Sequence, residues 1–369
     1  MSSASRPRRQ RVDLDRPSTY QHLDPAGMLQ CAVDFPSQVQ HAAQIGAAFK
    51  LSRTFRNPQH IVLAGMGGSA VAGDLLARLI EDRAPAPFLV CRGYDLPKFV
   101  GPTTLFLASS HSGNTEETLS AVRAARRRKA RVVCISTGGE LRSFAQRQRP
   151  DPIPVLSIPQ TDPPIMPRSA LGYSLIPLVY LLGHLGLYPG AKAHVRETIA
   201  VLSSLRETVH PDVPTPRNPA KQLATSLFGK IPWVQGTAGL MGAAAYRWRC
   251  QFNENSKTLA YSSEYPELNH NEVVGWEDAP GLADQVEVVI LRRPGDHPRI
   301  QKRVEITRQI LKPKTRPHLV EASGRSHLAQ LLWTVYLGDF TSLYLAFLNH
   351  VDPHTIDNIN LLKSRLARA

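Results

Sequence analysis

The sequence has few cysteines and no cluster of residues that would hold a metal ion. Its 369 residues include four cysteines, none of them in a CxxC pair: Cys31, Cys91, Cys134 and Cys250. This spacing argues against a disulfide framework and a zinc site, and it is typical of packed thiols in a reduced protein. We therefore expect a cytoplasmic protein whose function requires no metal.

The chain also shows no pattern of a secretory leader and little that could cross a membrane. Its arginine-rich start is followed by Asp13, Asp15 and other polar residues rather than by an apolar core. Residues 170–188 are mostly apolar and nearly long enough to span a bilayer, but Pro177 and His184 interrupt them. We expect no signal peptide, and we interpret 170–188 as a buried core helix.

Acidic residues are scarce relative to basic ones, 30 against 44, which gives a formal net charge of +14. Part of the excess lies in two groups, one near the start (Arg6, Arg8, Arg9, Arg11, Arg16) and one in the middle (Arg123, Arg126, Arg127, Arg128, Lys129, Arg131). Basic runs can bind nucleic acid, but they more often form solvated surfaces. We expect a flexible basic tail over residues 1–20 and a solvated helix face, without a nucleic-acid or membrane partner.

Short apolar segments alternate with helical ones through the first half. Strand patterns occur at 60–64, 87–91, 104–108 and 130–136, and helical patterns at 25–56, 70–80 and 115–129. Buried strands that alternate with helices predict a parallel sheet covered on both faces.

The same layout returns in the second half. Prolines loosen the pattern around 189–216, and strands are then expected at 231–235, 286–291 and 318–321, with a helix at 328–349. The fold class is therefore α/β, with two doubly wound domains, each a mostly parallel sheet flanked by helices. We assign residues 21–200 to an N-terminal domain and 215–369 to a C-terminal domain.

Two turns that follow strands could bind an anion through backbone N–H groups and a helix N-terminus. Gly65-Met66-Gly67-Gly68-Ser69 resembles part of a dinucleotide fingerprint, but the acidic residue expected at the next strand end is replaced by Arg92, which leaves an NADP-dependent oxidoreductase open. The second turn, 109–115, is rich in serine and precedes a helix. From its chemistry alone it fits a phosphate cradle and an ordinary capped loop equally well.

Several motifs carry a resemblance to a known family. Gly-Met-Gly-Gly-Ser at 65–69, Ser-His-Ser-Gly-Asn-Thr-Glu-Glu-Thr-Leu at 110–119 and Pro-Arg-Ser-Ala-Leu-Gly-Tyr at 167–173 resemble the sugar isomerase (SIS) domain. The strings at 253–257 and 266–276 and the C-terminal ending from Asp352 to Lys363 are similar to the bifunctional phosphoglucose/phosphomannose isomerases. The motifs occur in family order from about residue 40 to the C-terminus, and the string at 266–276 is the most specific.

The resemblance implies two SIS-type domains and reversible isomerisation of glucose 6-phosphate and fructose 6-phosphate, with mannose 6-phosphate also accepted, without a cofactor. It implies that the substrate phosphate is held by Gly68, Ser69, Ser110, Ser112 and Thr115. It also assigns the catalytic residues: Glu254 as the base that moves a proton between C1 and C2, Arg168 as the stabiliser of the enediolate, His270 of a neighbouring subunit for ring opening, and Lys363 at the sugar. The implied assembly is a homodimer with shared active sites.

The residue types suit this chemistry. A carboxylate can act as the base, a permanent arginine cation can face the oxygen on which charge develops, and histidine titrates near neutrality. Each residue also has an ordinary structural role open to it, and His111 stands where an aromatic or small residue is expected. A non-catalytic phosphosugar-binding regulator is the second interpretation, because it would keep the serine turn but would not need Glu254, His270 and Lys363.

Overall fold

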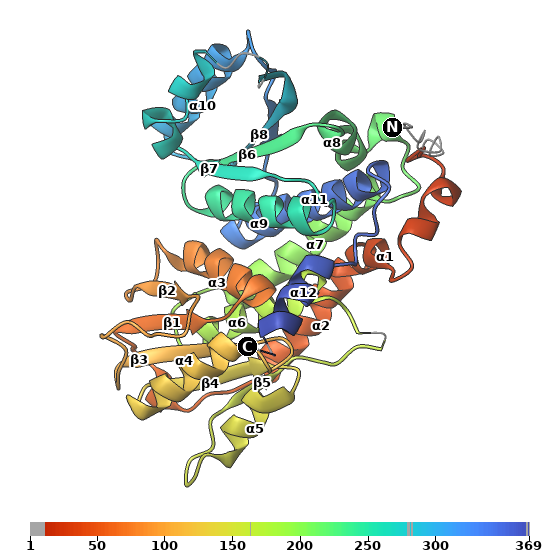
Figure 1. Ribbon diagram of the computed structural model, residues 1–369. Helices are drawn as coiled ribbons and strands as arrows, with labels where there is room; N and C mark the ends of the chain where they lie inside the picture. Colours follow the sequence, from red (N-terminus) through yellow and green to blue (C-terminus); the bar gives the residue numbers. More distant parts are fainter. Residues whose placement is uncertain (1–11, 163, 279–280, 282, 367, 369) are drawn as a thin grey trace.

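The structure is a computed structural model that describes residues 12–366 apart from 163, 279–280 and 282, together with residue 368. Two α/β lobes lie one above the other, and the N-terminal half forms the lower lobe (Figure 1). Arg6, Arg8, Arg9 and Arg11 of the basic tail lie outside the described residues.

The N-terminal sheet has five parallel strands in the order β2-β1-β3-β4-β5. Their bounds are β1 His60–Ala64, β2 Phe88–Cys91, β3 Thr104–Ser109, β4 Arg131–Ser136 and β5 Val155–Ser157. Alternate side chains point to opposite faces: Ile61 and Leu63 pack in the core shared with α3 (Gly67–Ile80) and α6 (Leu171–His184), whereas Val62 and Ala64 pack under α4 (Glu116–Arg127) and α5 (Gly139–Arg147). The expected parallel sheet covered on both faces is confirmed.

The C-terminal sheet has four parallel strands in the order β7-β6-β8-β9. Their bounds are β6 Ile231–Gly236, β7 Tyr261–Glu264, β8 Val286–Arg292 and β9 His318–Glu321. Helices α9 (Leu240–Glu254) and α11 (His327–Leu348) lie on the face toward the other lobe, and α10 (Pro298–Leu311) covers the outer face (Figure 1). Both halves are therefore doubly wound α/β structures.

Five further helices complete the described part of the chain. They are α1 Met28–Val33, α2 Phe35–Ala48, α7 Ala191–Val209, α8 Pro219–Leu227 and α12 Asp357–Leu366. Short 3₁₀ turns are η1 Pro17–Thr19, η2 Gln21–Leu23, η3 Arg53–Phe55, η4 Pro167–Ser169, η5 Thr215–Arg217, η6 Glu267–His270, η7 Val274–Trp276 and η8 Ala283–Gln285.

The prolines around 189–216 suggested a loosely structured linker, but most of this region is helical. It contains α7, which packs against α2 from the N-terminal half and α11 from the C-terminal half. One apolar core includes side chains from both sheets, among them Leu63 of β1 and Val289 of β8. A boundary at residue 200 therefore falls inside a helix that joins the two lobes.

The expected flexible tail over 1–20 is wrong for its last nine residues. Val12, Leu14 and Tyr20 are buried, and the Tyr20 ring stacks on Phe347 of α11 with centroids 4.6 Å apart. These apolar side chains are spaced too irregularly to give a helical or strand pattern, so their burial could not be predicted from the sequence.

Helix α11 is the one described helix that is long and apolar enough to cross a membrane, but 83% of its apolar window is buried inside the protein. Segment 170–188, which raised the same question in the sequence, contains the shorter helix α6, of 14 residues. Both helices pack in the core between the two sheets, so we interpret both as core helices.

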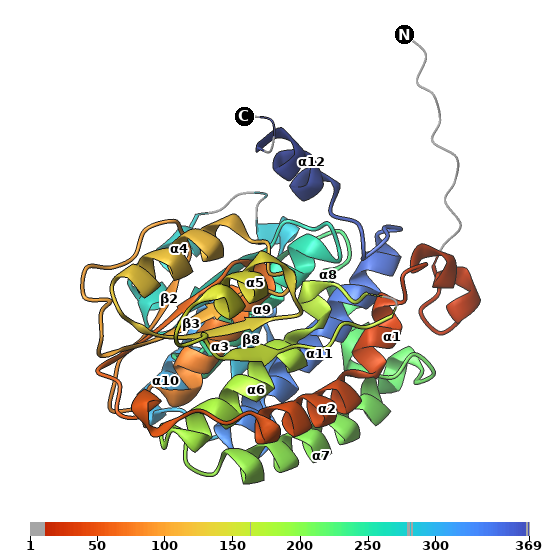
Figure 2. The same ribbon diagram turned by 90° about the horizontal axis from the view of Figure 1, so that it is seen from below.

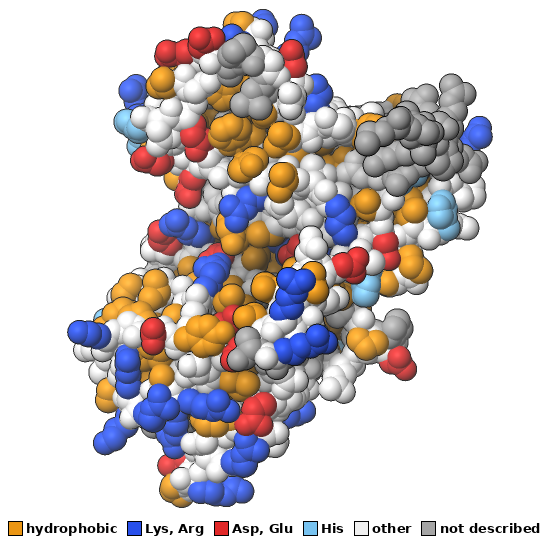
Figure 3. Space-filling model, in the orientation of Figure 1, with side chains coloured by type: hydrophobic (Ala, Val, Ile, Leu, Met, Phe, Trp, Pro, Cys, Tyr) orange, Lys and Arg blue, Asp and Glu red, His pale blue; other side chains and the backbone are white. Residues whose placement is uncertain are grey.

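The central basic group lies on the surface of the lower lobe, where Figure 3 shows many Lys and Arg side chains. Part of it has structural partners: Arg128 donates to the carbonyl oxygens of Leu96 and Pro97, and Arg131 donates to those of Thr54, Arg56 and Thr103. These arginines fasten loops at the amino-terminal edge of the sheet.

Candidate active site

The two predicted anion-binding turns lie side by side. Strands β1 and β3 are neighbours although β2 separates them in the chain, so the turns that follow them meet at the reversal point of the sheet. Ligands of open α/β sheets bind at this carboxyl edge. A Cβ on Gly65 would lie 2.9 Å from the Ser109 carbonyl oxygen, so only glycine permits this close approach.

The first turn is part of a helix. Helix α3 begins at Gly67, three residues earlier than expected, so Gly68 and Ser69 belong to its first turn. The unpaired backbone N–H groups and the positive end of the helix dipole therefore face the edge of the sheet. Ser69 itself is buried.

The serine turn is held by its own hydroxyl groups. The Ser110 hydroxyl lies 2.8 Å from that of Thr115 and accepts a hydrogen bond from the Gly113 N–H, while the Ser112 hydroxyl accepts one from the Asn114 N–H. Gly113 has a φ of 75°, and a Cβ there would lie 1.9 Å from the Gly138 carbonyl oxygen, so no other residue fits. The turn is thus held in place by its own hydrogen bonds.

His111 has a structural position within this turn. Its backbone oxygen accepts hydrogen bonds from the N–H and the hydroxyl of Thr137, which tie the turn to the end of β4. Its ring is partly buried, and burial lowers the pKa of His111, so the neutral imidazole is favoured. Its Nδ1 atom is buried without a hydrogen-bond partner among the described residues.

Arg168 is the most tightly held of the predicted catalytic residues. It lies in η4, just before α6, and its side chain is 4% exposed. Its Nε donates to Asn255 Oδ1 at 2.8 Å, its Nη2 donates to the carbonyl oxygens of Pro353 and His354, and its Nη1 lies 3.4 Å from Glu254 Oε2. A guanidinium has five N–H groups, so one on Nη1 has no partner among the described residues.

Glu254 is the last residue of α9, and its side chain is 33% exposed. Residues that follow Glu254 in the chain help to hold its ion pair with Arg168. Asn255 accepts from Arg168 and donates to Ser342 of α11, and Lys257 donates to the backbone oxygens of Glu254 and Asp352. Burial lowers the pKa of the Arg168 guanidinium, while the Glu254 carboxylate acts in the opposite direction.

A direct backbone contact joins this pair to the first anion-binding turn. A Cβ on Gly68 would lie 2.9 Å from the Pro167 carbonyl oxygen and 3.4 Å from the Arg168 N. The turn at 65–69 therefore contacts both the end of β3, which leads into the serine turn, and the backbone next to Arg168, and Glu254 reaches Arg168 from the other lobe. The structure brings together seven predicted residues: Gly68, Ser69, Ser110, Ser112, Thr115, Arg168 and Glu254.

His270 is not brought to Glu254 within one chain. The Glu264 carboxylate accepts from the Gly239 N–H at the start of α9, and His270 follows six residues later in η6. Glu254 ends the same helix, and 15 helical residues span ~22 Å. His270 is exposed, as a residue that serves another subunit would be.

Lys363 also lies apart from the other predicted residues. It belongs to α12, which stands away from the body of the protein and has no buried side chain among its described residues (Figure 2). The loop that leads to α12 is nevertheless anchored at the site, because the Pro353 and His354 carbonyl oxygens bind Arg168.

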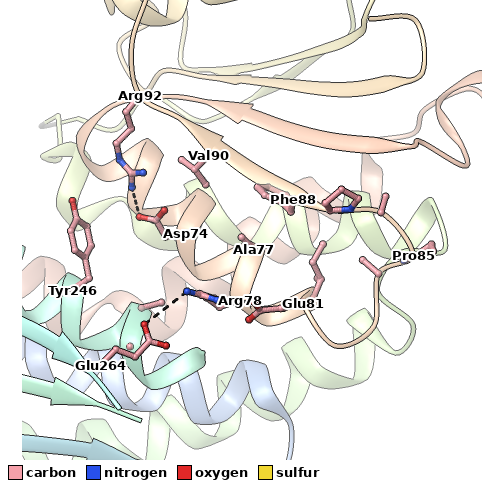
Figure 4. Close-up of a pocket in the computed structure, with 16 residues that line it drawn as sticks. Asp74, Ala77, Arg78, Glu81, Pro85, Phe88, Val90, Arg92, Tyr246 and Glu264 are labelled. Carbon is pink, nitrogen blue, oxygen red and sulfur yellow. Dashed lines mark hydrogen bonds and ion pairs between the residues drawn. The ribbon is translucent and has the colours of Figure 1, made fainter. Parts of the chain in front are cut away.

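A separate cleft of about 830 Å³ lies between α3 and β2 on one side and the start of α9 on the other (Figure 4). None of the predicted site residues lines it. Its cations already have partners: Arg92 pairs with Asp74, and Arg78 pairs with Glu81 and Glu264. Arg92 is thus engaged by a carboxylate, which does not favour its use for the 2′-phosphate of NADP.

Sequence reasoning missed several groups that hold the site. The backbone acceptors at 353 and 354 carry no side-chain signal, and Arg247, Asp339 and Ser342 lie outside the motifs. Asp339 did offer a clue, since it is a carboxylate inside an apolar helix of 22 residues. Within the described residues, no three His, Cys, Asp or Glu side chains are grouped so as to hold a metal ion.

Two domain families match the chain. The SIS domain matches residues 54–148, and the bacterial phospho-glucose isomerase C-terminal SIS domain matches residues 216–366. The first match spans β1 to α5, including both anion-binding turns, and the second spans the C-terminal sheet and the whole of α12.

Comparison with known proteins gives relatives over almost the whole chain. The chain is 40% identical to a bifunctional phosphoglucose/phosphomannose isomerase of Caldicellulosiruptor bescii, over 92% of this chain and 99% of the relative. It is 33% identical to one of Thermoplasma acidophilum, over 85% of this chain and 91% of the relative.

A solved structure shares the fold. A glucose-6-phosphate isomerase like protein from Thermus thermophilus matches with a TM-score of 0.57 and 22% identity, over 96% of this chain and 99% of that one. The two curated relatives are more than 30% identical and match over most of both chains, so the chain belongs to the bifunctional phosphoglucose/phosphomannose isomerase family.

Proposed function

We propose that this protein interconverts glucose 6-phosphate and fructose 6-phosphate, and mannose 6-phosphate and fructose 6-phosphate, through a cis-enediolate. The observation that carries the proposal is the pair formed by Arg168 and Glu254. Arg168 is a buried cation that lies beside the partly exposed Glu254 carboxylate, and one of its Nη1–H groups has no partner among the described residues. The backbone next to Arg168 also contacts the turn at 65–69.

The substrate phosphate binds at the carboxyl edge of the N-terminal sheet. The hydroxyl groups of Ser69, Ser110, Ser112 and Thr115 and the Gly68 N–H are its ligands, and the N-terminus of α3 adds a positive potential. Because the serine turn is already ordered by its internal hydrogen bonds, little conformational entropy is lost when the phosphate binds.

Glu254 removes the proton from C2 of the open aldose and delivers it to C1, while the hydroxyl proton passes from O2 to O1. Charge then develops on the sugar oxygens, where the free Nη1–H of Arg168 donates a hydrogen bond from a buried, fixed position. The enediolate is planar at C2, so a proton returned to one face gives glucose 6-phosphate and a proton returned to the other gives mannose 6-phosphate. The N-terminal lobe therefore binds the phosphate, and the C-terminal lobe supplies the base.

His270 of a second subunit opens the sugar ring, and Lys363 contacts the sugar. The support for this assignment is that His270 is exposed and lies beyond the far end of α9 from Glu254 in its own chain. The active assembly is a homodimer, and its compartment is the cytoplasm, where the four free thiols remain reduced.

A coupled assay with each hexose 6-phosphate tests the function. We expect wild type to convert both, and Glu254→Gln to lose about 10³-fold or more in kcat because an amide cannot accept the proton. Glu305→Gln, which changes a carboxylate in a surface ion pair, is the matched control and should keep the wild-type rate. Wild type that converts neither substrate refutes the proposal, whereas an active Glu254→Gln refutes only the base assignment.

A mixing experiment tests the shared site. Glu254→Gln and His270→Gln are each expected to be strongly impaired, but a mixed dimer has one site with both native residues. Random exchange of equal amounts should restore about one quarter of the wild-type activity, since half of the dimers are mixed and each has one intact site. If His270 acts within its own chain, mixing restores nothing.

A further inference from the structure

Asp339 lies in the middle of α11 and is connected to Arg168 by side chains from α9. Its carboxylate accepts from Arg247 Nη2 at 2.9 Å and from Gln251 Nε2 at 3.0 Å. Arg247, Gln251 and Asn255 are four residues apart on α9, so they lie on one face of the helix. Glu254, the last residue of α9, lies on the same face.

Arg247 connects the carboxylate to the backbone of the enediolate arginine. Its Nη2 also donates to the Arg168 carbonyl oxygen at 2.9 Å, and its side chain is 2% exposed. A buried arginine without a counter-ion is strongly unfavourable, so Arg247 can occupy this position only while Asp339 neutralises it.

A second chain of hydrogen bonds links the same turn of α11 to Arg168. The Ser342 hydroxyl donates to the Asp339 carbonyl oxygen and accepts from Asn255 Nδ2, and Asn255 Oδ1 accepts from Arg168 Nε. Arg168 is thus held at its backbone through Arg247 and at its guanidinium through Asn255. A small cavity of about 20 Å³ lies between these groups and α1.

We propose that Asp339 and Arg247 are a positioning pair for Arg168: the carboxylate holds and neutralises Arg247, and Arg247 fixes the backbone that carries the enediolate arginine. The inference rests on the proposed isomerase function and adds two residues to it. The pair also sets the charge balance, because Arg168 and Arg247 are matched by Glu254 and Asp339. Loss of the Asp339 charge would leave the base beside an unneutralised second cation.

The ionisable groups around Glu254 and Asp339 come from six elements. They are Arg168 from η4; Arg247, Cys250 and Lys257 from α9 and its C-terminal turn; Tyr336 and Asp339 from α11; Asp352 and His354 from the loop before α12; Asp24 from the loop before α1; and Cys31 from α1. Arg247 lowers the pKa of Arg168 through charge repulsion, after the larger effect of burial. Arg247 is therefore close enough to act on the reaction electrostatically.

Asp339→Asn tests the charge with little change of shape. We expect kcat for both hexose 6-phosphates to fall about tenfold or more, with KM changed less than about threefold, because the phosphate ligands lie in the other lobe. The acid limb of kcat/KM should move to lower pH, since the unneutralised Arg247 cation stabilises negative charge in the site. Adding Arg247→Met should return the acid limb to its wild-type position while kcat stays low.

Two further variants separate positioning from stability. Ser342→Ala removes only the second connection, so it should lower kcat without moving the acid limb. Asp15→Asn removes the partner of another buried cation, Lys221, away from the site, so it should lower the melting temperature and leave both kcat and the pH profile unchanged.

Different results would refute the positioning pair and the proposed function. Wild type that fails on both sugars refutes the proposed function. Active wild type with wild-type kcat and pH profile in Asp339→Asn refutes the positioning pair. If Asp339→Asn does not fold, Ser342→Ala and Arg247→Lys decide: wild-type kcat in both refutes the inference.

Discussion

Gly68→Ala tests the backbone contact between the turn at 65–69, the proposed phosphate site, and Arg168, the proposed stabiliser of the enediolate. The new Cβ would lie 2.9 Å from the Pro167 carbonyl oxygen and 3.4 Å from the Arg168 N. Both neighbours are backbone atoms, so no side chain can turn away. Gly68 is in the first turn of α3 and has no positive φ, so alanine suits its conformation and the helix.

The expected effect is therefore displacement rather than unfolding. The Pro167 carbonyl must move by about 0.5 Å to reach an ordinary contact distance, and a catalytic group tolerates about that much error. Since a misplacement of ~1 Å can cost about 100-fold in rate, we expect a loss of about tenfold in kcat. The melting temperature should change by less than about 3 °C.

Steady-state kinetics with both hexose 6-phosphates and thermal melts provide the measurement. Gly67→Ala is the matched control: its φ is 50° and nothing lies within 4 Å of the added Cβ, so it adds backbone strain of about 1–2 kcal/mol without pushing Arg168. It should lower the melting temperature and keep kcat near wild type. A Gly68→Ala variant with wild-type kcat would refute the mechanical link between the turn and Arg168.

Three other measurements follow from the structure. Tyr20→Ala removes a buried ring stacked on Phe347, so it should cost about 3–5 kcal/mol in unfolding free energy by denaturant titration, with unchanged KM; unchanged stability would show that the N-terminal segment does not pack as described. Calorimetry with a hexitol 6-phosphate, which cannot isomerise, should give one site per chain, because Glu264 and Asp296 occupy the corresponding donors of the C-terminal lobe; two sites would contradict this. Burial raises the pKa of Cys134 to about 12, so its thiolate is negligible at pH 8, and iodoacetamide should modify this thiol only after unfolding.

The fold was predictable where burial leaves a periodic signal. Strands β1, β3 and β4 are continuous apolar runs because both faces of the sheet are covered, and the glycines after β1 mark a turn that only glycine permits. Strand β7 was missed because its edge position leaves it half exposed and polar. Helix α7 was missed because prolines on both sides of it outweighed its apolar face.

The motifs named candidate site residues, but they did not indicate the geometry of the site. Arg168 and Glu254 were both named, yet nothing in the sequence indicated that they form a pair across two lobes. The partners that hold Arg168 are a side-chain amide and two backbone carbonyl oxygens, and backbone groups have no residue type. Long-range contacts of this kind depend on tertiary packing, which local patterns do not contain.

The two lobes have the same strand order at their reversal points, but the hydrogen-bond donors at these points differ in whether a carboxylate already binds them. In the C-terminal lobe, the turn after β6 offers the Thr237 hydroxyl and the Gly239 N–H, but Asp296 and Glu264 accept these hydrogen bonds at 2.7 and 2.6 Å. The corresponding donors after β1 and β3 have no such carboxylate among the described residues. Because side chains of the same lobe accept these hydrogen bonds, the edge after β6 is less available to an anion than the edge after β1 and β3. In our proposal the C-terminal lobe acts instead at the carboxyl end of α9, where the buried Arg168 cation lies 3.4 Å from Glu254 Oε2 and offsets the negative end of the helix dipole.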